Sequence, residues 1–160
     1  MTNFAIYTVP LSRGALAISP MPGRNGQFSA DFNILRKWSP NLVLTMTTMS
    51  ELADKNATDL SIHLSKLGID WLHLPIEDFG TPHGKTSELW PEAANLAHEI
   101  LDRGGKILAH CMSGQGRSGM AILRLMVERG IQPKIALKKI RNIRPMAVET
   151  DAQYHWASQI

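Results

Sequence analysis

The stretch from Lys106 to Gly119 combines residue types that can do chemistry on an anionic group. A short apolar segment ending at His110 predicts a strand, and a cysteine, two glycines and an arginine follow before an apolar helical pattern. The N–H groups of such a loop can turn inward and bind an anion at the start of the next helix. The positive potential there favours the thiolate of Cys111, which is the form that attacks. Arg117 carries a planar fork that can hold two oxygens of the anion.

Two neighbours of the cysteine have predicted supporting roles. Ser118 can donate its hydroxyl to the sulfur and so ease the departure of the sulfur from a phosphorylated intermediate. His110 precedes the cysteine in a strand and points to the opposite side, so we expect it to fix the loop by hydrogen bonding rather than to act as a base. The alternative interpretation of this stretch is a buried structural cysteine beside a chance glycine turn.

The string H-C-M-S-G-Q-G-R-S-G, residues 110–119, resembles the H-C-x5-R-[ST] signature of the cysteine-dependent protein tyrosine and dual-specificity phosphatases. Residues 75–82 are similar to the general-acid loop of the kinase-associated and Cdc-type members, and residues 144–153 resemble the segment after their penultimate helices. This resemblance implies a compact phosphatase that hydrolyses phosphomonoesters through a phosphocysteine intermediate at Cys111, without a cofactor or a metal. It also implies a set of phosphate-binding residues: Cys111, Met112, Ser113, Gly114, Gln115, Gly116 and Arg117.

Asp78 is the candidate general acid and base. A phosphoester leaves as a poor alkoxide or phenolate, so a carboxylic acid must protonate it, and a carboxylate can later activate the hydrolytic water. Asp78 follows a predicted strand, on a loop from which it can close over the site. Glu77 is chemically competent too, but extended neighbours point to opposite sides and the family pattern favours Asp78. An Asx turn is the alternative role for Asp78, and His83 on the same loop could touch substrate.

Gln153 resembles the glutamine that positions the hydrolytic water in related phosphatases. Thr150 and Gln153 also have the spacing of a capping box, which explains the glutamine structurally. Both interpretations stay open at this point. The other histidines have no metal-ligand spacing with further ligands, and we expect no metal site.

Length and composition fit a single domain spanning residues 1–160. With 160 residues and 44% hydrophobic content, the chain can bury a continuous core without disulfides or a metal. The single cysteine excludes an intramolecular disulfide and a cysteine-based zinc site. No apolar stretch approaches the roughly 20 residues that cross a bilayer, and Pro10, Ser12 and Arg13 interrupt the N-terminal region. We therefore expect a cytoplasmic protein that neither enters nor binds a membrane.

Positive charge is concentrated between residues 103 and 144, where ten Lys and Arg residues accompany one acidic residue. These basic residues alternate with apolar ones at helical spacing, which is typical of solvated helix faces. We expect this charge to attract a small anionic group, and we expect no nucleic-acid partner.

Strands and helices alternate along the chain. The predicted strands are 4–9, 15–18, 41–46, 69–76 and 106–110. The predicted helices are 28–38, 58–67, 87–103, 117–129, 133–144 and 150–159, with Pro91 in the first turn of its helix, where proline is tolerated. This pattern predicts the α/β class, with a central, mostly parallel, twisted sheet that has helices on both faces and a site beyond the carboxyl ends of its strands.

The preferred substrate is a phosphorylated protein or peptide. Met112, Ser113 and Gln115 leave the loop without the lysines that phosphoinositide-directed members of the family often carry. A phosphatase of a small phosphorylated metabolite or lipid is the alternative, and a phosphate-binding pseudophosphatase module is another. The joint presence of Cys111 and Asp78 argues against the pseudophosphatase, and the oligomeric state is not readable from this sequence.

Overall fold

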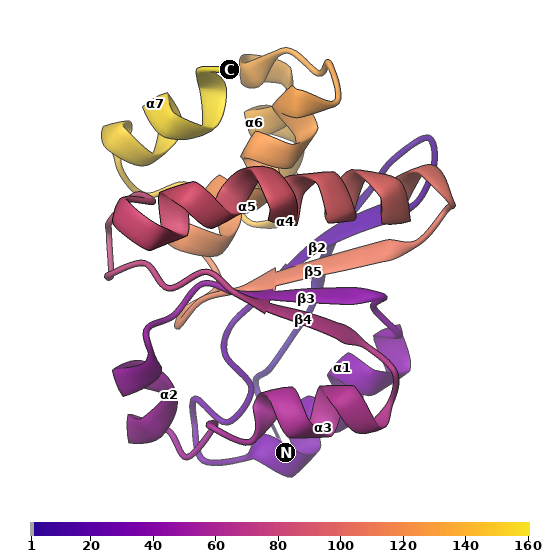
Figure 1. The fold of residues 1–160 in the computed structure, drawn as a ribbon, viewed down its shortest axis with the longest axis vertical. Coiled ribbons are helices and arrows are strands. Elements are labelled where there is room, and N and C mark those ends of the chain that lie inside the picture. The colour runs from indigo at the N-terminus through magenta and orange to yellow at the C-terminus, as the bar shows by residue number, and fades with distance from the viewer. Residues whose placement is uncertain (1) are drawn as a thin grey trace.

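The structure, a computed structural model, describes residues 2–160 and contains one five-stranded sheet (Figure 1). The strands lie in the order β1 (Tyr7–Pro10), β2 (Ala15–Ser19), β5 (Lys106–His110), β3 (Leu42–Thr45) and β4 (Asp70–His73). β1 runs antiparallel to β2, and the remaining pairings are parallel. The prediction of a mostly parallel sheet is confirmed.

Helices cover both faces of the sheet, as Figure 1 shows. One face carries α4 (Gly84–Asp102), α5 (Gly116–Glu128), α6 (Pro133–Ile143) and α7 (Asp151–Ser158). The opposite face carries α1 (Phe28–Trp38) and α3 (Leu60–Lys66), while α2 (Met49–Asp54) lies beyond the carboxyl end of β3. None of the helices within residues 2–160 has the length and apolar character to cross a bilayer.

The central strands are apolar on both sides because both sides are buried. In β5, Ile107 and Ala109 belong to the cluster that includes the apolar faces of α4 and α5. Leu108 points the other way and packs in a second cluster with Leu35 of α1 and Leu64 of α3. The five-residue strand that ends at His110 is therefore clamped between two cores, which holds its carboxyl end in place.

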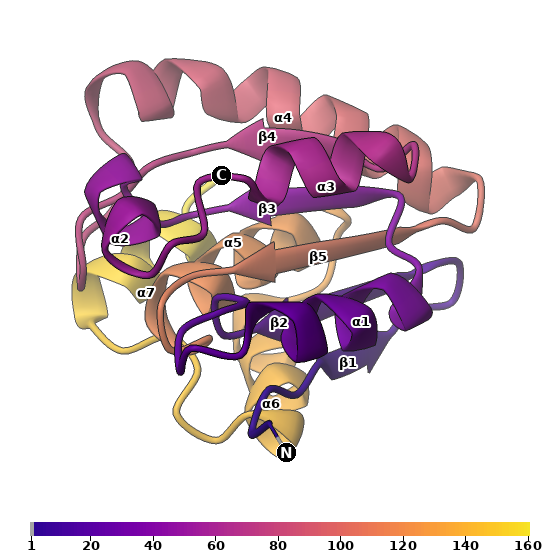
Figure 2. The same cartoon turned by 90° about the horizontal axis from the view of Figure 1, so that it is seen from below.

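The carboxyl ends of β3, β4 and β5 point to the same edge of the sheet (Figure 2). Hydrogen bonds continue past the strand ends: Met46 N–H donates to the His110 carbonyl and Leu74 N–H to the Thr45 carbonyl, each over 2.9 Å. Three connections begin at this edge. They lead from β3 to α2, from β4 to α4 and from β5 to α5. The candidate catalytic side chains other than Gln153 lie in these connections or in the first turn of α5.

The sequence prediction omitted α2. Thr48 caps this helix: its side chain accepts from the Glu51 N–H, and the Glu51 carboxylate accepts from the Thr48 N–H over 2.8 Å. This capping box is visible in the sequence as T-x-x-E, but the six-residue helix buries only Leu52 and so shows no apolar periodicity.

The expectation for Pro91 was wrong. α4 begins at Gly84 rather than at residue 87, so Pro91 lies inside the helix and not in its first turn. The neighbouring Trp90 and Ala94 are buried, and their packing holds the helix together across the missing N–H. Two strands also differ from expectation, because β1 begins at Tyr7 and β4 ends at His73.

Candidate active site

The loop between β5 and α5, residues 111–115, turns its carbonyl groups outward onto the rest of the protein. The Met112 carbonyl accepts from the Met21 N–H over 3.2 Å. Arg144 donates to two further carbonyls, through Nη2 to Ser113 over 2.8 Å and through Nε to Gly114 over 2.9 Å. Two segments distant in sequence therefore hold the orientation of the loop's peptide planes: the residues after β2 and the residues after α6.

The N–H groups of this loop and of the first turn of α5 have no acceptor within the part of the chain that the structure describes. Among residues 2–160, no carbonyl or side chain accepts from the backbone N–H groups of residues 112 to 118. Gly114 permits this arrangement, because its φ of +73° lies in the left-handed region and an added Cβ would come within 2.6 Å of Pro20 N. Seven inward N–H groups at the start of a helix form a site for an anion with several oxygens.

Cys111 directly precedes these N–H groups in the chain and is buried, with 2% of the residue exposed. Its Sγ lies 3.1 Å from the hydroxyl Oγ of Ser118, in the first turn of α5. The predicted contact between these two residues is therefore present. A hydroxyl at this distance can stabilise negative charge on the sulfur by donating a hydrogen bond.

His110 supports the loop from the other side of β5. Its Nδ1 lies 3.3 Å from the Cys111 carbonyl, and its Nε2 lies 2.7 Å from Thr45 Oγ1, which in turn accepts from Trp71 Nε1 over 2.7 Å. A neutral ring with its proton on Nδ1 fits all three hydrogen bonds: Nδ1–H donates to the Cys111 carbonyl, and Nε2 accepts from the Thr45 hydroxyl. Complete burial lowers the pKa of His110 to about 4, so the ring is neutral at physiological pH.

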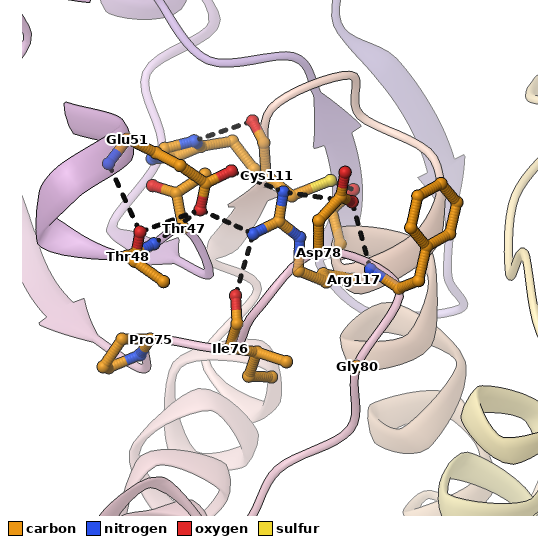
Figure 3. A network of polar contacts seen from close by, with 12 residues as sticks. Thr47, Thr48, Glu51, Pro75, Ile76, Asp78, Gly80, Cys111 and Arg117 are labelled. Atoms are coloured by element: carbon orange, nitrogen blue, oxygen red, sulfur yellow. Dashed lines mark hydrogen bonds and ion pairs between the residues drawn. The ribbon is translucent and has the colours of Figure 1, made fainter. Parts of the chain in front are cut away.

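Arg117 is 2% exposed and is held by Glu51 of α2 (Figure 3). Nη1 and Nη2 donate to the two carboxylate oxygens of Glu51 over 2.8 and 2.9 Å, and Nη1 also donates to the Ile76 carbonyl over 2.8 Å. Burial by itself would lower the pKa of Arg117, but the Glu51 hydrogen bonds and nearby negative charge outweigh it and raise that pKa. Burial would likewise raise the pKa of Glu51, but hydrogen bonds from Arg117 and Thr48 lower it.

Asp78 approaches the guanidinium from the loop between β4 and α4. Its Oδ1 lies 3.5 Å from Arg117 Nη2, and its side chain is 61% exposed. Phe79 N–H donates to the same oxygen over 3.1 Å, inside a turn closed by Gly80 N–H and the Glu77 carbonyl. Of the two candidate acids on this loop, Asp78 is therefore the one that the structure brings to Arg117.

Glu77 and His83 lie apart from this group. The Glu77 side chain is 79% exposed, and its carboxylate lies 3.7 Å from Nε2 of His83, whose side chain is 72% exposed. These two side chains pair with each other, which leaves Asp78 as the carboxylate of this loop beside the arginine.

Gln153 lies buried at the start of α7, where it completes a capping box with Thr150. Its Oε1 accepts from the N–H groups of Glu149 and Thr150, and its Nε2 donates to the Gly80 carbonyl over 3.1 Å. Both ends of the amide are thus engaged by the protein. The capping interpretation describes its contacts, and the same side chain also ties α7 to the loop of Asp78.

Two site residues were not found from the sequence. Glu51 is visible there only as part of an unrecognised capping box, and its pairing with Arg117 spans 66 positions of the chain. Glu149 lies against Gly116: a Cβ added to that glycine would come 2.2 Å from Glu149 Oε1. No local pattern marks Glu149, because its place depends on how the segment after α6 returns to the loop.

Comparisons with known proteins agree on one family. The family described as "Tc-R-P: Polymorphic toxin system, DSP-PTPase phosphatase" matches residues 20–131. Cyclin-dependent kinase inhibitor 3 of Mus musculus is 31% identical over an alignment 169 residues long, gaps included. The alignment covers 97% of this chain and 77% of that protein. Putative tyrosine phosphatase 067L of Invertebrate iridescent virus 3 is 31% identical over 119 residues, which cover 71% of this chain and 48% of the viral protein.

The fold has a matching solved structure as well. A crystal structure of kinase associated phosphatase, with serine in place of its catalytic cysteine, gives a TM-score of 0.83 at 25% identity and covers 98% of this chain and 93% of that one. The fold and these matches define a cysteine-dependent phosphoric monoester hydrolase. The chain belongs to the family of tyrosine and dual-specificity protein phosphatases, as the sequence resemblance predicted, and Cys111 occupies the expected position.

Replacing Glu51 by glutamine tests the anchoring of Arg117. The Glu51→Gln variant keeps the shape of the side chain but removes the charge that faces a buried guanidinium. We expect the free energy of unfolding to fall by about 2 kcal/mol, and turnover of p-nitrophenyl phosphate to fall by about 10²-fold because Arg117 is misplaced. Urea denaturation and steady-state kinetics measure the two effects. Glu88→Gln, on an exposed position of α4, should change neither, and equal behaviour of the two variants would contradict the anchoring role.

The neutral His110 ring makes stability depend on pH. The unfolded chain binds a proton to this histidine below about pH 6.5, whereas the folded protein binds it only near pH 4, so stability is lost as the pH falls through this window. Between pH 7 and pH 5 we expect a loss of about 2 kcal/mol in the free energy of unfolding, measured by urea denaturation. His110→Asn should be less stable at pH 7 but should lose most of this pH dependence; an unchanged dependence would assign it to other groups.

Proposed function

We propose that this protein removes phosphate from phosphorylated proteins through a phosphocysteine intermediate on Cys111. The observation that carries the proposal is the cradle of seven N–H groups in residues 112 to 118, which have no acceptor among residues 2–160 and directly follow the Cys111 nucleophile. Such a cradle binds the phosphoryl oxygens and stabilises the charge that develops on them in the transition state. The phosphate-binding group in this proposal consists of Cys111, Met112, Ser113, Gly114, Gln115, Gly116 and Arg117.

The unused donors of Arg117 support its role in binding the phosphoryl group. A guanidinium has five N–H donors. Both donors of Nη1 are taken by Glu51 and the Ile76 carbonyl, and one donor of Nη2 is taken by Glu51. Among residues 2–160, Nε and the second donor of Nη2 form no hydrogen bond, although Asp78 Oδ1 lies 3.5 Å from Nη2. These two donors form a fork that matches two phosphate oxygens.

In the first step, the Cys111 thiolate attacks phosphorus while the bond from phosphorus to the substrate oxygen breaks. Asp78 gives its proton to the departing oxygen, which requires the acid to lie at the mouth of the cradle. Its position beside Arg117 Nη2 and its exposure on a loop support this role. In the second step, water attacks the phosphocysteine and the sulfur leaves as a thiolate, to which Ser118 can donate a hydrogen bond.

A phosphorylated protein is the substrate class that the family favours. The matching relatives are named as a tyrosine phosphatase and a kinase inhibitor, and the matching structure is a kinase associated phosphatase. The absence of lysine between Cys111 and Arg117 fits phosphotyrosine or mixed phosphoresidue substrates better than polyphosphorylated lipids. The proposed nucleophile needs a free thiol, which a reducing compartment such as the cytoplasm maintains.

Replacing the nucleophile separates binding from chemistry. Cys111→Ser should lose turnover of p-nitrophenyl phosphate and of phosphotyrosine peptides, while the affinity for inorganic phosphate should stay close to that of the unchanged protein, because the amides and Arg117 bind the anion. Steady-state kinetics and isothermal titration calorimetry measure the two properties. Activity within about tenfold of the unchanged protein would overturn the proposed nucleophile.

A leaving-group series tests the acid role of Asp78. If Asp78 protonates the departing oxygen, Asp78→Asn should slow phenyl and alkyl phosphates by about 10²-fold or more, and activated nitrophenyl esters much less. The matched control is Glu77→Gln, which should follow the unchanged protein across the series. Equal slowing of all esters by Asp78→Asn would make this residue a structural part of the loop, and a steeper dependence in Glu77→Gln would transfer the acid role to its neighbour.

A further inference from the structure

The carboxylate of Glu149 lies against the phosphate-binding loop without contributing to its structure. A Cβ added to Gly116 would come 2.2 Å from Glu149 Oε1 and 3.2 Å from Gln153 Nε2, so the carboxylate lies directly against the loop at this position. Among residues 2–160, no side chain or backbone N–H donates to the Glu149 carboxylate, and no cationic side chain pairs with it. An ionised carboxylate is only an acceptor, so both of its oxygens are free to accept a hydrogen bond from water.

The backbone is strained at Val148, the residue before Glu149. Val148 is 4% exposed and has a φ of +64°, a conformation that a β-branched residue rarely adopts. Its N–H donates to the Gln115 carbonyl over 3.1 Å, and Arg141 donates to its carbonyl over 2.9 Å. These contacts hold a valine in an unfavourable conformation and thereby turn the next residue toward Gly116. Strain of this kind, of order 1–3 kcal/mol, persists where the surrounding structure enforces it, and it clusters at functional sites.

A second glycine allows this close approach. A Cβ added to Gly119 would come 2.9 Å from Val148 N and 3.2 Å from the Ala147 side chain. Gly116 and Gly119 lie one turn apart on the same side of α5. Gly119 is the one that the approach of segment 147–149 requires, because a side chain there would meet the Val148 backbone. On the other side of Glu149, Gln153 Oε1 accepts from the N–H groups of residues 149 and 150. The glutamate is therefore held at its place from both directions along the chain.

Asp78 and Glu149 differ in what engages them. Asp78 Oδ1 lies beside Arg117 Nη2 and accepts from the Phe79 N–H, whereas the Glu149 carboxylate has no such partner. The two acids reach the cradle from separate connections, one after β4 and the other after α6. The two proton transfers of the proposed reaction can therefore be carried by two different groups.

We propose that Glu149 is the general base of the second step. This inference rests on the proposed phosphocysteine route. A water molecule attacks phosphorus, the new P–O bond forms as the S–P bond breaks, and the electron pair of the broken bond stays on Cys111 as the thiolate. The Glu149 carboxylate takes the proton of the attacking water and later releases it to solvent. Asp78, which lost its proton in the first step, regains one from solvent, so the cycle ends with no net change in the enzyme.

Glu149→Gln tests this assignment, because an amide oxygen still accepts a hydrogen bond from water but does not take its proton. With p-nitrophenyl phosphate in stopped flow, we expect a burst of nitrophenol of about one equivalent, followed by turnover that is about 10²-fold slower than in the unchanged protein. An acid quench followed by mass spectrometry should show phosphate on Cys111. Since hydrolysis then limits the rate, kcat should become the same for p-nitrophenyl and phenyl phosphate.

Three controls make the outcome specific. Asp151→Asn changes an exposed carboxylate in the first turn of α7 and should behave as the unchanged protein. Asp78→Asn should slow the burst itself for phenyl phosphate, because it acts in the first step. Glu149→Ala should accumulate the same adduct as Glu149→Gln, and thermal unfolding should confirm that each variant is folded.

Two results would overturn the inference. Turnover of Glu149→Gln within about threefold of the unchanged protein would show that no proton passes to this carboxylate. A slowed burst without accumulation of the adduct would place Glu149 before the intermediate. If instead no variant forms an adduct and Cys111→Ser stays active, the proposed nucleophile itself fails, which is a different result from either of these.

Discussion

The orientation of the peptide groups in the loop after β5 and in the first turn of α5 is the constraint on which the site depends. N–H groups without a protein acceptor add no hydrogen bond to the fold, so other contacts must hold their orientation. The enforcement comes from the opposite side of the same peptides: Met21, Arg144 and Val148 bind the carbonyl groups. Segments distant in sequence are therefore tied to the catalytic loop through the backbone.

The second constraint is the burial of Arg117. A guanidinium that is 2% exposed requires a carboxylate with matching geometry, and Glu51 supplies it through two parallel hydrogen bonds. This contact explains why a six-residue helix stands directly after β3. Its capping box aligns the Glu51 side chain, because the same Oε2 accepts from the Thr48 N–H and from Arg117 Nη1.

Gln153 connects two parts of the site, the loop of Asp78 and the segment of Glu149, through one amide. Its oxygen accepts hydrogen bonds from the N–H groups of Glu149 and Thr150. Its nitrogen donates to the carbonyl of Gly80, two residues after Asp78. The loop that carries the proposed acid and the segment that carries the proposed base are thus held in register by a single buried side chain. This coupling gives the glutamine a positioning role that includes, and extends beyond, capping α7.

Sequence alone determined the features of this protein that depend on residues close together in the chain. The alternation of strand and helix patterns predicted the parallel sheet, and the spacing of Cys111, the loop glycines and Arg117 predicted the anion cradle, because a strand, a tight loop and a helix start are specified within fourteen residues. Tertiary structure alone decided that Glu51 pairs with Arg117 and that Glu149 reaches Gly116. Those contacts join segments that meet only after the sheet and its helices have packed, and a single charged residue on a short helix or loop carries no periodic signal of its eventual partner.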